Sequence, residues 1–500
     1  MYSSSCCQSL RAVRVGTLLF PPAGLLLLWR SSQISVGRKL FGTIGIAFYA
    51  LLYLTLVLFL ATRFLGLQCE FRGGMVPRFT FHKTLPDYSA LEANRARQKS
   101  DTRTSVPLVS SVPSATSAPP WTGFRGSNRD GVSYDQNFLT TWPANGLRPL
   151  WRQPIGGGYS SFAVAGGRAY TLEQRRRQEV ITAYDVQTGR EIWAQGWDAE
   201  FQETLGGDGP RATPAFDDGR VYALGALGEF RCLDAATGNV LWRRNILEEN
   251  GALELTYGTA ASPLIVDDKV IVAPGGQRGR SVVAYHKISG EPIWKSLNDE
   301  AAYSSPMLVQ LAGQRQLLVV TQTRSVGLDV EDGKLLWEFP WIVLQNNRNI
   351  AQPLLLGTNR FLLSAGYGTG CVAVEVNRTA REIWRNKLLK NKFTSSVFWN
   401  GFIYGLDEDI LTCLDATTGA RKWKDGRYDY GQLLLVHGHL IVLCGNGDLA
   451  LVKATPDRWE ELTRSRAIDG KTWNHPALWN GYLLIRNAAE MACFDLANRD

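Results

Sequence analysis

The segment that indicates the fold most clearly is CLDAATGNVLWRR, residues 232–244. It consists of a short apolar run, a turn that contains Asp and Thr-Gly, and a second apolar run that reaches Trp. Asp234 can accept backbone N–H bonds in a tight turn, and Gly238 adopts the positive φ that such a turn needs. Nearly the same letters return at residues 413–425 as CLDATTGARKWKD. The stretch therefore predicts a β-hairpin that the chain repeats.

The hairpin phrase occurs seven times between residues 183 and 459, with an average spacing of about 44 residues between successive closing tryptophans. Repeats of ~40–50 residues built from short strands are typical of β-propeller blades. A Trp on the outgoing strand is large enough to pack between one blade and the next, so we expect a structural role for it. These blade-docking residues are Trp193, Trp242, Trp294, Trp337, Trp384, Trp423 and Trp459, with Trp151 as an eighth.

A second phrase marks the innermost strand of each blade and gives a count of eight. Its versions are YSSFAV, RATPAF, TAASPLIV, YSSPMLV, AQPLLL, FTSSVFW, GQLLLV and WNHPALW, which start at residues 159, 211, 259, 303, 351, 393, 431 and 473. The phrase near residue 493 lacks a closing Trp, so we expect its strand to pair with the strand around Trp151. The sequence thus predicts an all-β, eight-bladed propeller over residues 121–500, because such closure leaves no long exposed sheet edge.

The N-terminal region has the composition of a membrane anchor. Residues 40–62 contain no charged residue and are long enough to cross ~30 Å of hydrocarbon as a helix. Within residues 1–39, the stretch 17–29 is also apolar but is broken by Pro21-Pro22, so it predicts either a second, strained span or a segment lying in the interface. The basic residues Arg30, Arg38 and Lys39 favour the cytoplasmic side.

Either number of spans places the rest of the chain outside the cytoplasm, so we expect an extracytoplasmic, periplasmic propeller. Residues 63–120 form a juxtamembrane segment, in which 88–98 predict a short helix and 100–120 a Ser/Pro-rich extended linker. Residues 1–120 hold 13 basic and 4 acidic groups, whereas the remaining residues hold 41 and 42. This balance gives no support for a nucleic-acid partner of the propeller.

The recurring D-x-x-T-G-x-x-x-W phrase resembles the PQQ-like, or quinoprotein alcohol dehydrogenase-like, β-propeller repeat superfamily over about residues 121–500. Two subfamilies of this superfamily have different functions. Quinoprotein alcohol dehydrogenases hold pyrroloquinoline quinone (PQQ) and usually Ca²⁺ in the central channel, whereas BamB-type proteins bind no cofactor and act as scaffolds in outer-membrane protein assembly. The opening WTGFRGSNRDGVS, residues 121–133, is similar to a third group of uncharacterised membrane-anchored PQQ-like repeat proteins.

The residues that a quinone enzyme of this superfamily would use are largely missing. The only adjacent cysteines, Cys6-Cys7, precede the apolar segment, and no C-x-x-C-H haem attachment motif occurs. Cys232, Cys413 and Cys493 share one repeat position and should be small buried groups without disulfides. His437 and His439 flank a predicted hairpin tip, and two ligands alone make a weak metal site. We therefore expect no catalytic residue, no metal and no PQQ.

The starts of the innermost strands should meet at the mouth of the channel, where aromatic and polar side chains can line a ligand site. The candidates are Tyr159, Arg211, Tyr303, Gln352, Phe393, Gln432, Trp473 and His475. The function that we expect is a membrane-anchored extracytoplasmic propeller that binds or scaffolds protein partners. The alternatives are a quinoprotein-like, PQQ-dependent alcohol dehydrogenase and a sensor that binds a small molecule.

Overall fold

The computed structural model describes residues 3–32, 34–65, 67–70, 78–80, 86–104, 120–135, 138–143, 146–343 and 349–497. The chain forms two compact units. The first comprises residues 1–70 and 77–83, and the second comprises residues 71–76 and 84–500. The helix predicted at residues 88–98 extends to residue 104, so the prediction of an extended linker is wrong for residues 100–104, and residues 105–119 lie outside the described residues.

Three helices dominate the first unit: α1 (Ser3–Leu19), α2 (Pro21–Arg30) and α3 (Val36–Phe64). The chain turns at Phe20, whose backbone is extended, and Pro21 then begins α2 because the first turn of a helix does not need its missing N–H. Val13, Leu28, Ile34 and Ile46 form a small buried cluster. A two-stranded antiparallel sheet, β1 (Gln68–Glu70) with β2 (Arg78–Thr80), completes the described part of this unit.

The predicted span at residues 40–62 lies entirely within α3. Within the described part of the chain, α3 is the one helix that is long and apolar enough to cross a membrane. In contrast, α2 has 10 residues. At 1.5 Å per residue it rises about 15 Å, roughly half the hydrocarbon thickness. The stretch 17–29 is therefore divided between two helices and forms no continuous span.

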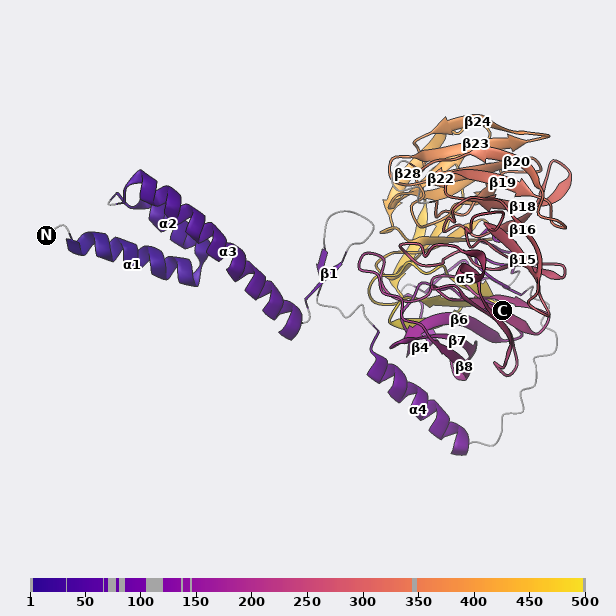
Figure 1. Ribbon diagram of the computed structural model, residues 1–500, viewed down its shortest axis with the longest axis horizontal. Coiled ribbons are helices and arrows are strands. Elements are labelled where there is room, and N and C mark those ends of the chain that lie inside the picture. Colours follow the sequence, from indigo (N-terminus) through magenta and orange to yellow (C-terminus); the bar gives the residue numbers. More distant parts are fainter. Residues whose placement is uncertain are drawn as a thin grey trace. The chain divides into compact units, whose positions relative to one another are not determined.

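The second unit contains α4 (Tyr88–Thr104) and a ring of eight antiparallel sheets (Figure 1). This arrangement confirms the predicted eight-bladed β-propeller. We number the blades 1 to 8 in chain order, starting from the sheet of β5. Blades 1 to 4 consist of β5 (Ala163–Ala165), β6 (Arg168–Arg175), β7 (Gln178–Asp185) and β8 (Glu191–Asp198); β9 (Ala215–Asp217), β10 (Arg220–Leu224), β11 (Glu229–Asp234) and β12 (Val240–Asn245); β13 (Leu264–Val266), β14 (Lys269–Val272), β15 (Val282–His286) and β16 (Pro292–Ser296); and β17 (Met307–Leu311), β18 (Gln314–Val320), β19 (Arg324–Leu328) and β20 (Leu335–Pro340).

The remaining blades follow the same plan, with the innermost strand first and the outermost strand last. A short helix, α5 (Ile246–Asn250), follows the outer strand of blade 2. Blades 5 to 8 consist of β21 (Leu354–Leu355), β22 (Arg360–Ala365), β23 (Gly370–Val376) and β24 (Ala380–Asn386); β25 (Val397–Trp399), β26 (Phe402–Asp407), β27 (Ile410–Asp415) and β28 (Arg421–Arg427); β29 (Gln432–Val436), β30 (His439–Leu443), β31 (Asp448–Lys453) and β32 (Glu461–Arg466); and β33 (Ala477–Trp479), β34 (Tyr482–Arg486), β35 (Glu490–Asp495) and β4 (Pro149–Pro154).

Blade 8 closes the ring from both ends of the propeller sequence. Its outermost strand, β4, pairs antiparallel with β35, and Trp151 lies opposite Cys493. The predicted pairing of these two strands is confirmed. Because β4 comes from the start of the propeller and β33 to β35 from its end, each end of the sequence supplies backbone hydrogen bonds to the other.

The repeated Gly and Trp are partners across each blade boundary. A Cβ on Gly238 would lie 2.7 Å from the ring of Trp193 in the preceding blade, and one on Gly290 would lie 2.8 Å from Trp242. These glycines also have positive φ, so the turn needs Gly both for its conformation and for the close approach to the Trp. Six of the eight Trp residues donate their indole N–H to a backbone carbonyl in the next blade: Trp151, Trp193, Trp242, Trp294, Trp384 and Trp423.

The other two Trp residues depart from this pattern. Trp337 donates its indole N–H to the side-chain oxygen of Gln316 in its own blade, at 2.5 Å. Trp459 donates to the hydroxyl of Tyr428 instead. It faces blade 8, in which β35 is not joined to β4 by a hairpin, so that blade has no Thr-Gly turn at this position.

Candidate functional site

The blades create two different faces. Because every inner strand starts at the same end of the channel, the loops that lead from each outer strand to the next inner strand all gather there. We call this end the upper face, and the opposite end, which carries the Thr-Gly turns, the lower face. The two longest connections on the upper face within the first three blades are residues 199–214 and 246–263.

A belt of side chains joins neighbouring inner strands just below the upper face. The backbone N–H of Ser161 donates to Thr213 Oγ1 at 3.0 Å, and that of Thr213 donates to Ser262 Oγ at 2.9 Å. The same bond repeats from Ser262 to Ser305, from Ser305 to Gln352 and from Gln352 to Ser395. Since the strands of different blades do not pair, this belt supplies the polar contacts that the inner strand starts would otherwise lack.

His475 occupies the belt position of blade 8. Its ring is buried, and its nitrogens lie 2.7 Å from the carbonyl oxygen of Pro476 and 2.8 Å from that of Leu433. Burial, with the nearby Arg125 guanidinium, lowers the pKa of His475 to about 3. The imidazole is therefore neutral at ordinary pH, and its single N–H can donate to one of these two carbonyl oxygens.

Half-buried aromatic rings cover the upper mouth of the channel. The rings of Tyr159 and Trp473 stack at 5.9 Å, and Trp473 lies 4.3 Å from Phe393, which in turn lies 5.6 Å from Tyr430. We call these four residues, which come from the starts of the inner strands of blades 1, 8, 6 and 7, the aromatic lid. A separate pair, Tyr257 and Tyr303, has its ring centres 5.7 Å apart.

Three cationic side chains lie on these rings. Lys471 Nζ is 4.5 Å from the centre of the Trp473 ring, and Lys392 Nζ is 5.2 Å from that of Tyr430. The Arg211 guanidinium lies 4.6 Å from the Phe201 ring and 5.5 Å from the Tyr159 ring. Cation–π contacts of this kind fix long side chains in place, so the mouth combines positive charge with flat apolar surfaces.

The lower half of the channel is filled by the chain itself, which the sequence did not predict. Residues 120–135 enter from the lower face, and β3 (Val132–Ser133) pairs parallel with the inner strand β29. Trp121 makes two backbone hydrogen bonds with Val164 of another inner strand, β5. We call residues 120–135 the plug.

Two buried arginines hold the plug by donating to inner-strand carbonyls. Arg129 donates to the carbonyl oxygen of Pro306 at 2.9 Å, and to those of Ser262 and Pro263. Arg125 donates to the Ser396 carbonyl oxygen at 2.8 Å. Burial lowers the pKa of Arg125 to about 10 and that of Arg129 to about 9. Gly131 is required beside Arg125, because a Cβ there would lie within 2.4 Å of the guanidinium.

Exposed aliphatic side chains stand on three upper-face loops. Leu253 is 80% exposed, Ile342 is 59% exposed and Leu205 is 48% exposed. Leu205 and Leu253 belong to the two long connections at residues 199–214 and 246–263. Exposed apolar side chains of this size are what a protein-docking surface uses.

Buried polar atoms without a hydrogen-bond partner occur one position before the belt. They are the hydroxyls of Ser304 and Thr394 and the side-chain oxygen of Asn474. All three side chains are buried at the start of an inner strand. A small polar molecule in the channel would satisfy such atoms.

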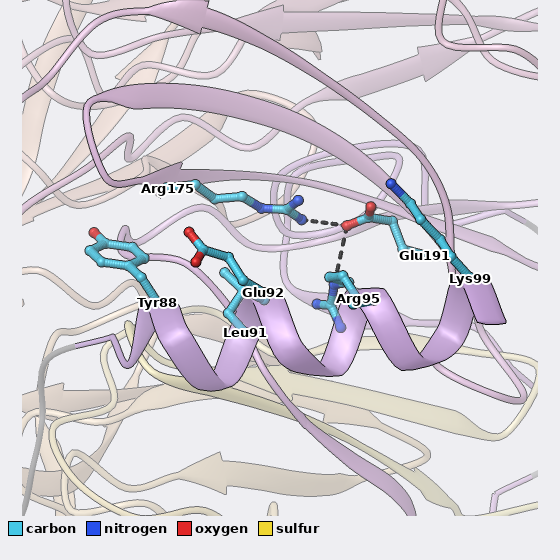
Figure 2. A pocket seen from close by; sticks show the side chains of 8 residues that line it. Tyr88, Leu91, Glu92, Arg95, Lys99, Arg175 and Glu191 are labelled. Carbon is cyan, nitrogen blue, oxygen red and sulfur yellow. Dashed lines mark hydrogen bonds and ion pairs between the residues drawn. The ribbon is translucent and has the colours of Figure 1, made fainter. Parts of the chain in front are cut away.

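A groove of about 300 Å³ separates part of α4 from blade 1 (Figure 2). Figure 2 shows the guanidinium groups of Arg95 and Arg175 pointing toward the Glu191 carboxylate, at 3.1 and 2.5 Å. Arg95 also donates to Gln153 of blade 8, so α4 bridges the two blades at the ring closure. Arg176 pairs with Glu92 of α4. The arginine triplet 175–177 is thus paired within the chain.

The structure divides the eight predicted channel-mouth residues into two groups. Tyr159, Phe393 and Trp473 belong to the aromatic lid, and Arg211 and Tyr303 lie beside it. The other three are wall residues: Gln352 and His475 serve the belt, and Gln432 donates to the Phe393 carbonyl oxygen at 3.0 Å. Sequence reasoning missed Tyr257, Tyr430, Lys392, Lys471 and the plug arginines. The signal for the two lysines was a basic residue shortly before an inner-strand aromatic residue, one position before Phe393 for Lys392 and two positions before Trp473 for Lys471.

The family profile described as outer membrane protein assembly factor BamB matches residues 176–425, half of the chain. The chain belongs to this BamB family of PQQ-like repeat propellers. BamB from Burkholderia pseudomallei (strain K96243) is 23% identical over 363 residues, which cover 61% of this chain and 87% of the relative.

Solved structures of BamB-like and dehydrogenase propellers share the fold. BamB from Moraxella catarrhalis superposes with a TM-score of 0.51 at 14% identity, covering 71% of this chain and 99% of the other. Quinohemoprotein alcohol dehydrogenase from Comamonas testosteroni gives 0.57 at 13% identity, covering 82% and 85%. At these identities the likeness concerns the fold alone.

The described residues of the propeller provide neither a cluster of His, Cys, Asp and Glu side chains nor a pair of adjacent cysteines. Among the described residues, no group of three or more His, Cys, Asp or Glu side chains could hold a metal ion. Cys232, Cys371, Cys413, Cys444 and Cys493 are free and buried, as expected for the three that share a repeat position. His437 and His439 lie at the predicted hairpin tip, where His437 contacts the Asp135 carbonyl oxygen. The lid rings contact one another instead of facing a planar ligand on two sides.

Proposed function

We propose that this chain is a membrane-anchored, extracytoplasmic scaffold that binds protein partners on the upper face of its propeller. The observation that carries the proposal is the exposure of Leu205, Leu253 and Ile342 on three connections of the upper face, the face that also carries the aromatic lid. Aliphatic anchors next to half-buried aromatic rings are what a partner can bury on docking. Membership of a family described as an assembly factor supports the same role.

The anchor in this proposal is α3. Its 29 residues are sufficient for a span, and Arg38 and Lys39 near its N-terminal end favour a cytoplasmic location for that end. The propeller would then face away from the cytoplasm. A reporter active only outside the cytoplasm, fused after residue 120, should be active, and activity of a cytoplasm-only reporter there would reverse the orientation.

The docking proposal is tested by charging the exposed anchors of the full-length protein. The double variant Leu205→Asp with Leu253→Asp should lose at least tenfold of the partner that co-purifies with the wild type after mild cross-linking, because a carboxylate cannot be buried cheaply. Ile288→Asp is the matched control, since Ile288 is exposed on a lower-face turn. Equal recovery from both variants would place docking elsewhere.

A small-molecule site is the second candidate, and the unpartnered atoms of Ser304, Thr394 and Asn474 favour it. The ligand would be small and polar and would lie below the aromatic lid. Native mass spectrometry of the full chain should then show a bound mass that is lost in Trp473→Ala. An unligated mass in both proteins would leave the scaffold as the sole function proposed.

A further inference from the structure

One buried carboxylate connects the bases of the two long upper-face loops. Glu179, on β7, is completely buried. Its Oε2 accepts the indole N–H of Trp197 at 3.1 Å, and its Oε1 accepts the backbone N–H of Ala226 at 2.9 Å. The contact is close, because a Cβ on Gly225 would lie 2.1 Å from Oε2. Glu179 thus joins blade 1 to a turn of blade 2.

The first loop begins directly after the Trp197 that Glu179 holds. This connection, residues 199–214, carries the exposed Leu205. The second loop ends beside Ala226, whose carbonyl oxygen accepts the N–H of Thr259 at 2.8 Å. That connection carries Leu253. Phe201 of the first loop and Gly258 of the second also meet at this point, since a Cβ on Gly258 would be 3.1 Å from the Phe201 ring.

The surroundings of Glu179 provide hydrogen bonds but little compensating charge. Arg231, on β11, stacks on the Trp197 ring at 4.7 Å, but its guanidinium is paired with Glu229 at 2.8 Å. Arg211, from the first loop, favours the ionised form of Glu179 only through space, and the charge of Glu229 disfavours it. Burial is the largest influence and raises the pKa of Glu179 to about 7. The two donated N–H groups favour the ionised form, but burial without a paired cation favours the neutral form more strongly.

We propose that Glu179 is a proton-operated switch for the upper face: the neutral carboxyl holds both loops in the docking conformation, and loss of its proton to solvent loosens them. The inference rests on the proposed docking function, to which it adds a form of regulation. A buried anion without a paired cation is costly, and opening of the loop bases admits water to it. Partner binding should accordingly weaken as the pH rises toward neutrality.

The test is hydrogen exchange of the full-length protein in detergent between about pH 5 and 8.5, corrected for the intrinsic exchange rate. Protection of residues 199–214 and 252–259 should fall by up to about tenfold per pH unit, the limit for one proton, with a midpoint at about pH 6, and should level off above about pH 7. Glu179→Gln should keep its protection across the range. Glu254→Gln, which removes an exposed carboxylate of the second loop, is the control and should behave as the wild type.

Two outcomes would overturn the switch: unchanged protection in the wild type, or the same pH dependence in Glu179→Gln. If Glu179→Gln does not fold, Trp197→Phe replaces it. Loss of the indole donor should move the midpoint to higher pH, because that bond stabilises the carboxylate. The exchange measurement needs no partner, so a normal switch combined with failed co-purification would reject the docking function alone.

Discussion

The two ends of the central channel are formed by the same eight inner strands but have opposite characters. At the lower end, the plug places Arg125 and Arg129 on inner-strand carbonyls, and β3 adds a strand to blade 7. At the upper end, aromatic rings meet over the channel, and Leu253 is exposed on one of the long connections of the same face. The lower end uses its polar groups internally, whereas the upper end keeps surfaces that a partner can bury.

This difference separates structural residues from residues available for binding. Among the three wall residues first expected at the mouth, His475 and Gln352 have hydrogen bonds that the fold itself requires. Changes at the lower end and in the wall should therefore alter stability, and changes at the upper end should alter binding. Each of the following predictions tests whether a change alters stability or binding.

The largest effect should come from opening the ring. Deletion of residues 488–500 removes β35 and leaves β4 and β34 without their shared neighbour. We expect a loss of more than about 5 kcal/mol in the free energy of unfolding, or failure to fold, because the backbone partners of two strands disappear. Thermal unfolding measures it, with deletion of 498–500 as the control. An unchanged melting temperature would contradict the closure.

The next largest effect should come from the plug. Arg129→Met removes the donor from three inner-strand carbonyls. Leaving buried acceptors unpaired costs about 1–3 kcal/mol each, partly offset because a buried charge is also removed, so we expect a net loss of about 3 kcal/mol. Arg243→Met, at an exposed position on β12, should change stability little. Equal effects in urea unfolding would mean that the plug does not stabilise the channel.

The wall should make the protein sensitive to acid through His475. The folded pKa of about 3 lies below the ordinary value of 6.5, so the stabilisation is complete above pH 6.5 and is lost as the pH falls toward 3. The shift corresponds to an effect on the order of 5 kcal/mol. In His475→Gln, chosen because Gln352 occupies the matching belt position, unfolding free energy should vary less over this range. The control His286→Gln should retain the wild-type acid sensitivity.

The smallest effect is expected from quinone. We predict that PQQ with Ca²⁺ causes no saturable absorbance change on the purified full chain below micromolar concentration and supports no alcohol-dependent dye reduction. The lid rings pack together, and the adjacent cysteines Cys6-Cys7 lie outside the propeller. Stoichiometric tight binding of PQQ together with dye reduction would contradict this prediction and would support an enzymatic site at the upper mouth.

The repeat made the ring predictable from sequence, whereas the contents of the channel were not. The pattern that contains Gly238 and Trp242 predicts a hairpin from local sequence. The number of times that this pattern recurs gives the number of blades. The predicted pairing near Trp151 and Cys493 followed from that count. The plug was missed because residues 121–133 resemble a solvated glycine-rich turn, and the acceptors of Arg129 lie more than 130 positions away.

The candidate site shows the same limit. Tyr159, Phe393 and Trp473 were found because each begins a recognisable inner strand. The contact between Phe393 and Trp473 joins blades 6 and 8, and no local pattern gives the distance between them. The burial of Glu179 was not predicted from the sequence either. The alternation of residues along a strand predicts that Glu179 faces solvent, whereas neighbouring blades cover it.

The most direct test of the account is site-specific photo-cross-linking in intact cells. A photoreactive residue at Leu253 on the upper face should give a discrete protein adduct, and one at Ile288 on the lower face should not. Both positions are exposed, so accessibility alone does not distinguish them. Adducts of equal yield at the two positions, or an adduct only at Ile288, would contradict the claim that the upper face is the docking surface.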